Sequence, residues 1–380
     1  MGSLVDDPFS TEPKTSRSSF YNRERELSLI EGAVREGRRL VLVLGVRRAG
    51  KTSLIRVALN ELGVPHVFLD LRALGSYEDR ALYGLLSEEI NRILPWSKRV
   101  VQYLKRVRGV SVGEGGVSIK LGDERPNVVS LLRALDEWAA DEGFALPVVL
   151  DEAQELRFFR GGKRRTDFRK VLAYCYDNLE STTFILSGSE VGLLFDFMGV
   201  EDPRSPLFGR RYVEVRVERL SRESSLDFLV KGFERHGLSL PAELLERAVE
   251  AFDGIIGWLT YFGAEVVALH REAGAVDYEE AIMAARGKAV RLCAEELRKL
   301  AARSRLYLGI LAALGEGGRT WSEIALALER RFKRTVSSPQ LGALLRNLIE
   351  LSYVEKRDGR YWALDPLTPE AAALLLSETR

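Results

Sequence analysis

Five short apolar segments stand out along the first 220 residues. They lie at residues 39–45, 66–71, 146–151, 182–188 and 212–217. Each is rich in Val, Ile, Leu or Phe, and helical patterns lie between most of them. Apolar strands that alternate with helices are typical of a parallel sheet covered on both faces. The pattern therefore predicts an α/β domain over residues 20–220, which starts with a short amphipathic helix near residues 28–34.

Two polar stretches interrupt or precede this pattern. Residues 1–19 are polar, with two prolines and a Ser/Thr cluster, so we expect a disordered tail there. Residues 109–122 alternate between apolar and polar positions on both sides of a glycine-rich centre. That alternation predicts a β-hairpin inserted in the α/β domain.

The strand patterns stop after residue 220, and the rest of the chain has a different character. Residues 221–300 read as a set of helices, which we expect to form a helical lid. Residues 301–380 contain three helical patterns and then a hairpin turned at Asp358-Gly359. The helical patterns cover residues 303–314, 321–331 and 338–351. Three helices followed by a hairpin is the order of a winged-helix domain.

Residues 45–52, Gly-Val-Arg-Arg-Ala-Gly-Lys-Thr, match the phosphate-loop pattern G-x-x-x-x-G-K-[ST] between a strand and a helix. Its glycines let backbone N–H groups face phosphates, and the helix that begins near Lys51 adds the positive end of its dipole. We expect Lys51 to reach the β- and γ-phosphates of ATP, and the Thr52 hydroxyl to ligate Mg²⁺. The residues predicted to bind ATP or ADP here are Gly45, Arg48, Ala49, Gly50, Lys51, Thr52 and Ser53. Arg47 and Arg48 add charge inside the loop, and the nucleotide, a neighbouring subunit and DNA are all open as their partner.

A second acidic site follows at the end of the third apolar segment. Asp151 ends that strand and is expected to hold Mg²⁺, usually through water. Glu152 follows it and can orient and deprotonate the attacking water, which indicates hydrolysis, although a solvated carboxylate is the alternative. Ser187 ends the next apolar strand and is the candidate for a polar contact near the γ-phosphate, with Ser189 second; a plain turn at the strand end is the alternative.

Composition excludes several classes of protein. Net charge is +1, so any affinity for nucleic acid must come from local patches. No apolar run approaches the ~18 residues of a membrane span and no signal-peptide pattern is present, so we expect a cytoplasmic protein. Two distant cysteines and three scattered histidines make neither a disulfide framework nor a metal cluster. Arginine outnumbers lysine 44 to 12, which fits either a thermophilic source or a GC-rich genome.

Taken in order, these motifs resemble the archaeal ATPase family, within the signal-transduction NTPases of the AAA+-related P-loop class. The likeness covers roughly residues 20–370. It includes FYNRERELSLI (20–30), the phosphate loop, VVLDEAQEL (148–156), ILSGSEVGLL (185–194), SPLFGRRYVEVRVERLS (205–221), FDGIIGWLTYFG (252–263) and LDPL (364–367).

The resemblance implies an AAA+-like sheet with strand order 5-1-4-3-2, a lid, and a C-terminal winged helix. It implies that Arg23 and Glu24 lie near the adenine. It also implies that Arg210 approaches the γ-phosphate as an arginine finger, in cis or in trans, although Arg211 makes the assignment ambiguous. One position departs from the family, because Ile256 replaces the proline that packs on the adenine. An isoleucine can still supply that apolar contact.

Two basic regions are candidate DNA contacts. In a helix-turn-helix reader, residues near the start of the last helix meet base edges, and a wing meets phosphates. The candidate residues are Gln340, Arg346, Lys356, Arg357 and Arg360. The other region is residues 157–170, with seven basic residues and one acidic residue. For the winged helix, binding of protein and packing on the chain's own ATPase domain remain alternatives. Residues 157–170 could contact DNA, a neighbouring subunit or the nucleotide, and a solvated loop is the alternative.

Three functions fit this sequence. The first is an ATP-hydrolysing switch, dependent on Mg²⁺, that repositions the winged helix and acts on DNA. The second is a signalling scaffold whose nucleotide state governs protein assembly without DNA. The third is a loader similar to replication initiators. A monomer and a nucleotide-dependent homo-oligomer are both compatible with the sequence.

Overall fold

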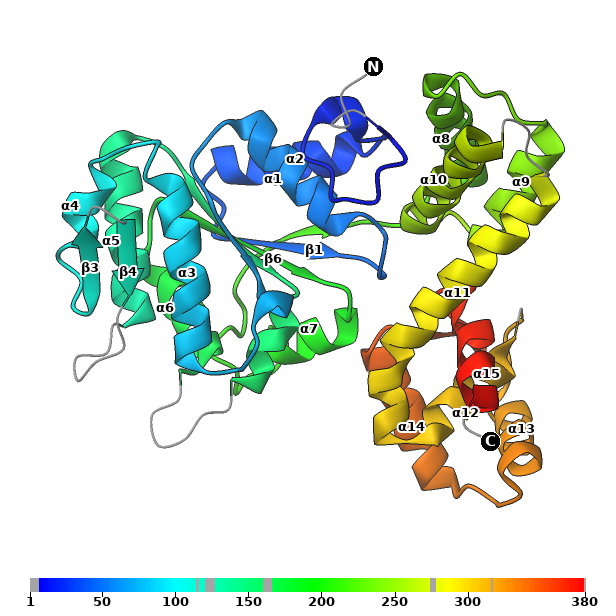
Figure 1. Ribbon diagram of the computed structural model, residues 1–380. Helices are drawn as coiled ribbons and strands as arrows, with labels where there is room; N and C mark the ends of the chain where they lie inside the picture. Colours follow the sequence, from blue (N-terminus) through cyan, green and yellow to red (C-terminus); the bar gives the residue numbers. More distant parts are fainter. Residues whose placement is uncertain are drawn as a thin grey trace. The chain divides into compact units, whose positions relative to one another are not determined.

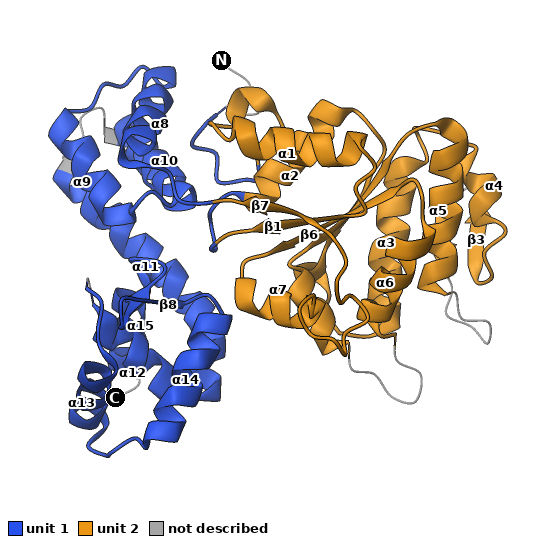
Figure 2. Cartoon of the chain, turned by 180° about the vertical axis from the view of Figure 1, so that it is seen from behind, with its two compact units in different colours: residues 1–13, 46–50, 218–380 blue, residues 14–45, 51–217 orange. Residues whose placement is uncertain are grey.

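The computed structural model describes residues 7–113, 116–119, 127–159, 166–273, 278–315 and 317–378. The chain divides into two compact units, which are coloured separately in Figure 2. Unit 1 contains residues 1–13, 46–50 and 218–380, and unit 2 contains residues 14–45 and 51–217. The phosphate loop therefore begins and ends in unit 2, while its five central residues cluster with unit 1.

A five-stranded sheet forms the centre of unit 2 (Figure 1). Its strands are β1 (Leu40–Leu44), β2 (Val67–Asp70), β5 (Leu146–Asp151), β6 (Thr182–Gly188) and β7 (Val213–Arg216). They stand in the order β2-β5-β6-β1-β7, and every pairing is parallel. Counted along the chain within this sheet, and read from the β7 edge, that order is 5-1-4-3-2. All residues of β1, β5 and β6 are buried, and the predicted α/β fold with a parallel sheet is confirmed.

Helices cover this sheet from both sides, with α1 and α2 above it and α7 below it in Figure 1. The helices of unit 2 are α1 (Glu24–Arg35), α2 (Lys51–Leu62), α3 (Asp79–Ile93), α4 (Val100–Leu104), α5 (Val128–Glu142), α6 (Phe168–Asn178) and α7 (Val191–Met198). Short 3-10 turns lie at η2 (Arg17–Ser19), η3 (Leu71–Ala73) and η4 (Ala153–Phe158). The apolar faces of helices α3 to α7 and the strands β1, β2, β5 and β6 form one buried cluster that includes Trp138. Helix α1 starts four residues before the predicted helix at residues 28–34.

A two-stranded hairpin packs beside α3. Strands β3 (Val110–Gly113) and β4 (Gly116–Ile119) pair in antiparallel fashion inside the segment where the sequence predicts a hairpin. Asn91 on α3 fixes β4, because its side chain donates to the Val117 carbonyl at 3.0 Å and accepts from the Val117 N–H at 2.7 Å. Residues 114–115 and 120–122 of the predicted hairpin lie outside the described residues.

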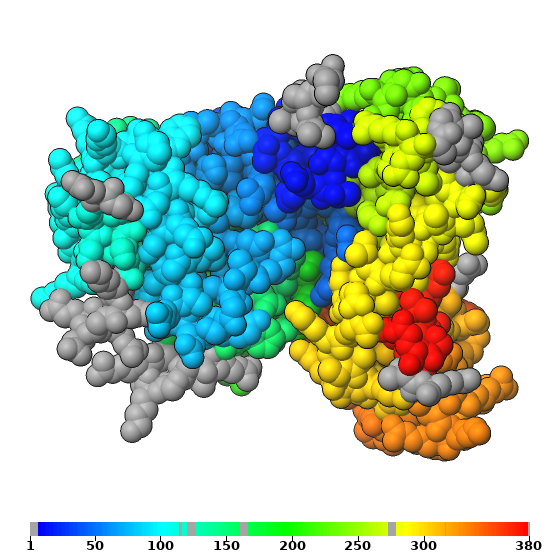
Figure 3. Space-filling view, viewed as in Figure 1, coloured from blue at the N-terminus to red at the C-terminus, as the bar shows by residue number. Residues whose placement is uncertain are grey.

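Unit 1 is mostly helical. It contains α8 (Arg222–Arg235), α9 (Ala242–Phe252), α10 (Ile256–Ala273), α11 (Tyr278–Arg303), α12 (Arg305–Leu314), α13 (Trp321–Phe332), α14 (Ser338–Glu350), β8 (Val354–Arg357), β9 (Arg360–Ala363) and α15 (Thr368–Glu378). Strands β8 and β9 pair around Asp358 and Gly359, both of which have positive φ. The final helix α15, absent from the sequence prediction, packs against α11, as the red and yellow atoms in Figure 3 show.

Residues 7–13 correct the prediction of a disordered tail over residues 1–19. The Phe9 side chain is only 1% exposed and lies among the rings of Phe228, Phe233 and His236, with centroids 5.6, 4.8 and 5.9 Å away. Asp7 Oδ1 accepts from the backbone N–H of Phe9 at 2.8 Å and lies 2.9 Å from His236 Nε2. One aromatic ring therefore anchors an otherwise polar segment, because burying it removes a large apolar area from water. Residues 1–6 lie outside the described residues.

Candidate functional site

The phosphate loop connects β1 to α2, and it requires glycine at two positions. A Cβ on Gly45 would lie 2.4 Å from the carbonyl oxygen of Val217, so any side chain there would displace backbone. Gly50 has a φ of +95°, a left-handed conformation that other residues rarely adopt. Helix α2 begins at the next residue, Lys51, and the N–H groups of a first helical turn have no partner inside the helix. This strand–turn–helix geometry suits anionic phosphate groups.

The first turn of α2 carries three polar side chains in fixed positions. Lys51 is buried, and its Nζ donates to the carbonyl oxygen of Gly45 at 2.8 Å. Thr52 Oγ1 donates to Asp151 Oδ2 at 2.9 Å. Ser53 Oγ accepts from the backbone N–H of Lys14 at 3.0 Å, which ties the N-terminal segment to α2. Lys51 thus lies at the phosphate loop and Thr52 at the Asp151 carboxylate, which are the positions that their predicted roles require. Ser53, which the sequence predicts to bind nucleotide, has its hydroxyl bonded to the backbone of Lys14 instead.

Asp151 is the centre of a polar cluster at the carboxyl end of the sheet. It is fully buried, and besides the Thr52 hydroxyl its carboxylate accepts a hydrogen bond from Ser187 Oγ at the end of β6. Burial raises the pKa of Asp151 and the neighbouring Glu152 charge adds to that effect, while the hydrogen bonds from Ser187 and Thr52 oppose it. The structure therefore brings together three residues that the sequence predicts to act together.

Glu152 has a left-handed backbone, with a φ of +56°, and a buried side chain. Its Oε2 atom accepts from Gln154 Nε2 at 2.7 Å, from Ser189 Oγ at 2.7 Å and from the Ser189 N–H at 3.1 Å. Burial alone would raise the pKa of Glu152. The nearby charge of Lys51 and the three hydrogen bonds outweigh burial, and the pKa lies below its ordinary value. The carboxylate is consequently ionised at neutral pH and held in one orientation.

Arg72 is a charged group at this site that the sequence interpretation missed. It follows β2, and its guanidinium binds Asp70 in a fork, with Nε to Oδ1 and Nη2 to Oδ2 both at 2.9 Å. Asp70 is the register partner of Asp151 in the β2–β5 pairing, and Arg72 Nη2 lies 3.7 Å from Asp151 Oδ2. Strand order 5-1-4-3-2 places the second strand beside the third. In the sequence, the sign of this charged group was the stretch Asp70-Leu71-Arg72 at the end of the strand predicted over residues 66–71.

The residues that the family resemblance assigns to the adenine and the γ-phosphate have local partners. Arg23 is buried with a φ of +75° and pairs with Glu26 at 3.0 Å. Glu24 accepts from Arg17. Arg210 binds Asp177 on α6, with Nε to Oδ1 at 3.2 Å and Nη2 to Oδ2 at 2.5 Å. None of these partners belongs to the phosphate loop or to β5.

The loop residues of unit 1 pack on the start of α10. Ile256 Cγ2 lies 3.5 Å from the position that a Cβ of Gly50 would take. The Gly257 N–H donates to the Arg48 carbonyl oxygen at 3.0 Å, and the Arg48 guanidinium lies 4.1 Å from the Trp258 ring centroid. Ile256, the residue that departs from the family pattern, therefore lies beside the phosphate loop.

The five predicted DNA contacts lie on α14 and on the β8–β9 hairpin. Gln340 and Arg346 are exposed on α14. Lys356 and Arg357 stack on rings of the facing strand, 5.4 Å from the Tyr361 centroid and 4.9 Å from the Trp362 centroid respectively. Arg360 Nη1 donates to the Gly318 carbonyl at 2.8 Å and lies 3.6 Å from Glu323. Arg360 is thus partly neutralised.

Of the basic segment 157–170, residues 160–165 lie outside the described residues. Arg157 lies 3.7 Å from Glu190 and stacks on Phe158, with its charge 4.4 Å from the ring centroid. At the other end, Arg169 follows the cap of α6, where Asp167 accepts from its N–H. At least these two members of the segment therefore have partners within unit 2.

The polar cluster fits a nucleotide with Mg²⁺. Thr52 Oγ1 and Asp151 Oδ2 are hard oxygen ligands on adjacent elements, of the kind that Mg²⁺ uses together with water and phosphate oxygens. Within the described ranges no group of three or more His, Cys, Asp or Glu side chains gathers to hold a metal. Such a site is thus expected to depend on the nucleotide for part of its ligands.

Comparison with known proteins identifies the family. The sequence model of an ATPase domain found predominantly in Archaea matches residues 20–262, which is most of the region that resembles it. The chain belongs to this archaeal ATPase family. The family comprises ATPases, so hydrolysis of ATP is the activity of this chain, and the resemblance inferred from its motifs is confirmed.

Solved structures agree with the family. The Walker-type ATPase of Pyrococcus abyssi is 34% identical, with a TM-score of 0.80 over 96% of this chain and 99% of that one. The ORC2 protein of Aeropyrum pernix, solved as ADPNP and ADP complexes, is 14% identical, with a TM-score of 0.62 over 94% and 95% of the two chains. The second likeness shows the fold alone. No curated protein sequence matches the chain. Within the described residues, no helix is both long and apolar enough to cross a bilayer.

Proposed function

We propose that this archaeal-family ATPase binds ATP at the start of α2 and hydrolyses it with Mg²⁺ as a conformational switch. The observation that supports this most directly is the meeting of Lys51, Thr52, Asp151 and Glu152 at one edge of the sheet. Lys51 would exchange its bond to the Gly45 carbonyl for β- and γ-phosphate oxygens. Thr52 and Asp151 would hold Mg²⁺, which supplies positive charge to the phosphates when bound.

Glu152 is proposed to accept the proton of the attacking water. Among the described residues, all three hydrogen bonds to its carboxylate engage Oε2, so Oε1 is the oxygen assigned to the water. Its lowered pKa keeps the group ionised as a base. A positioned general base contributes roughly 10²–10⁴-fold to a rate.

The residues around this centre keep their predicted roles as proposals. Ser187 is assigned to the γ-phosphate region through its bond to Asp151. Arg23, Glu24 and Ile256 are assigned to the adenine side. Arg210 is assigned to transition-state charge, and it would have to leave its Asp177 ion pair to act in cis or in trans.

Paired variants test the assignment of the ATPase centre. Lys51→Ala is expected to abolish nucleotide binding measured by calorimetry. Glu152→Gln is expected to keep ATP affinity within about threefold while turnover falls at least about a hundredfold. Glu155→Gln, three residues along on η4, is the matched control and should retain turnover. Normal turnover in Glu152→Gln would remove Glu152 from its role.

We propose further that nucleotide state repositions the C-terminal helices and hairpin, and that these bind DNA as a winged helix. Support comes from the order α12, α13, α14, β8, β9 and from exposed Gln340 and Arg346 on α14. The alternative partner is a protein. That alternative would be favoured if the chain formed homo-oligomers in the presence of nucleotide and its ATPase rate did not respond to DNA.

Salt dependence tests the DNA proposal. Arg346→Gln and Arg357→Gln are each expected to weaken binding of every duplex and to lower the salt slope by about 0.9 per lost phosphate contact. Arg25→Gln, on the exposed face of α1, is the charge-matched control. ATPase rate and particle mass should be measured with duplex, branched and single-stranded DNA. Unchanged affinity and slope in both variants would dispose of the winged-helix contacts.

A further inference from the structure

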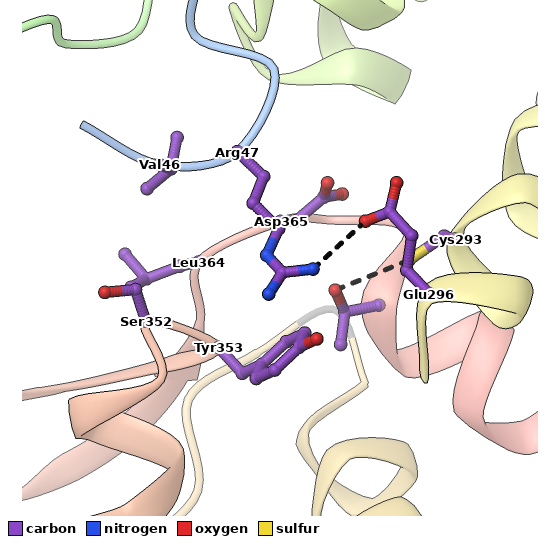
Figure 4. Close-up of a pocket in the computed structure, with 9 residues that line it drawn as sticks. Val46, Arg47, Cys293, Glu296, Ser352, Tyr353, Leu364 and Asp365 are labelled. Atoms are coloured by element: carbon purple, nitrogen blue, oxygen red, sulfur yellow. Dashed lines mark hydrogen bonds and ion pairs between the residues drawn. The ribbon is translucent and has the colours of Figure 1, made fainter. Parts of the chain in front are cut away.

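The two arginines inside the phosphate loop share one carboxylate. Arg48 Nη2 donates to Glu296 Oε1 at 2.5 Å, and Arg47 Nη1 lies 3.6 Å from Glu296 Oε2. Figure 4 shows Arg47 and Glu296 facing each other across a small cavity, and Tyr353 below them. The Arg47 charge lies 5.1 Å from the Tyr353 ring centroid. Glu296 therefore pairs with both arginines of the loop, and its single negative charge offsets one of their two positive charges.

The backbone of the loop is held at the same place. Arg48 has a φ of +62°, an uncommon conformation for a residue with a side chain, which persists only where the surroundings enforce it. Its carbonyl accepts from Gly257, and a Cβ on Gly257 would lie 2.7 Å from Arg48 Cβ. Its Nε is buried without an acceptor among the described residues, so Glu296 and the Trp258 ring carry the interactions of the guanidinium.

These contacts lead into the C-terminal elements. The Trp258 indole Nε1 donates to Asp365 Oδ2 at 2.8 Å, and Asp365 caps the turn into α15 through the Leu367 N–H at 2.9 Å. Tyr353 directly precedes β8. Arg47 and Glu296 line a cavity of about 20 Å³, which has room for about one water molecule, and Tyr353, Asp365 and Thr368 line it as well. Loop, α10, α11 and the residues around β8 and α15 thus form one contact network.

We propose that Glu296 is a positioning residue for nucleotide binding. It holds Arg47 and Arg48, keeps the loop in its left-handed turn, and passes any displacement of the loop to α11 and to the segment 353–368. The inference rests on the proposed switch function, since it names the residue through which that switch acts. Glu296 need not touch the nucleotide, because its effect is transmitted through the loop arginines.

Glu296→Gln tests the proposal in the full-length chain, with Glu295→Gln as the control. Glu295 is the adjacent residue of α11 and pairs with Arg298 at 2.8 Å, so it undergoes the same charge change without contacting the loop arginines. Three quantities are measured: Kd for ADP, kcat for ATP, and hydrogen-exchange protection of residues 353–368 with and without ADP. Glu296→Asp tests rescue by a shorter carboxylate.

About a third of each partner side chain is exposed, so the pair is weak on its own. Glu296→Gln is therefore expected to raise Kd by only about twofold to fivefold and to leave kcat within about twofold. The ADP-dependent change in protection at residues 353–368 should fall by at least about half, and Glu296→Asp should restore part of it. Glu295→Gln should behave as the unmodified chain.

Two results would count against the proposal, and they differ in meaning. If the unmodified chain responds to ADP at residues 353–368 and Glu296→Gln responds equally, the role of Glu296 is overturned while the switch stands. If the unmodified chain shows no response there, the switch fails, and the inference fails with it.

Discussion

Replacing Phe9 with alanine should destabilise unit 1, although the residue lies in a polar segment of the sequence. The ring is buried among Phe228, Phe233 and His236. A Cβ on Gly232 of α8 or on Gly263 of α10 would lie 2.3 Å from the ring, so the backbones of both helices pack directly against it. Removing the ring leaves a cavity that two glycines cannot fill.

The expected cost follows from that cavity. Truncation of a buried phenylalanine to alanine costs about 3–5 kcal/mol. For a unit of this size, about 1 kcal/mol moves the unfolding temperature by roughly 2–4 °C, so Phe9→Ala should lower the transition of unit 1 by about 6–20 °C. Differential scanning calorimetry of the full chain measures this shift directly.

Two further variants make the result decisive. Phe9→Leu keeps most of the apolar volume and should cost clearly less than alanine. Glu12→Ala alters an exposed residue of the same segment and should leave the transition unchanged. Equal transition temperatures for Phe9→Ala and the unmodified chain would refute the buried anchor and restore the disordered tail.

Three other predictions concern buried or charged groups. Burial raises the pKa of the thiols of Cys175 and Cys293 to about 12, so neither thiol should react with a thiol reagent at pH 8 in the folded chain. After denaturation both thiols should react, and rapid labelling of the folded chain would contradict the burial of these groups. Arg72→Gln removes a positive charge that lies 3.7 Å from Asp151, so half-maximal turnover should need about threefold to tenfold less free Mg²⁺. An unchanged Mg²⁺ requirement would argue against the closeness of Arg72 to Asp151. Burial raises the pKa of Asp365, so the folded chain binds that proton more tightly than the unfolded chain does. Stability should therefore fall as pH rises above 3.8, the ordinary value for an aspartate, and Asp365→Asn should flatten that fall in thermal unfolding measured across the acid range; an equally steep fall in the variant would contradict the assignment.

The parts of the fold that the sequence predicts are those with a continuous local signal. Parallel strands buried on both faces are apolar throughout, so β1, β5 and β6 could be located without a structure. The same reasoning placed Asp151 at the end of a strand, beside the phosphate loop. Thr52 and Ser187 could be predicted to lie near Asp151, because the ends of parallel strands and the phosphate loop meet at one edge of the sheet.

Features that depend on distant partners could not be predicted in this way. The site of Phe9 is made by residues more than 200 positions away, and a lone aromatic residue has no periodicity. Arg72 becomes important only through the register of Asp70 with Asp151. Helix α15 is different, because Thr368 and Pro369 mark its start and the signal was overlooked.

The discontinuous course of unit 1 has a consequence for how the protein is made. Arg48 and Glu296 are separated by 248 positions. At translation rates of about 5–20 residues per second, the ribosome needs about 12–50 s to pass from one to the other. The sheet of unit 2 can assemble in that interval, but the central loop residues must wait for α10 and α11 before their lasting contacts exist. A nascent chain would therefore gain its mature nucleotide affinity late, after most of the polypeptide has emerged.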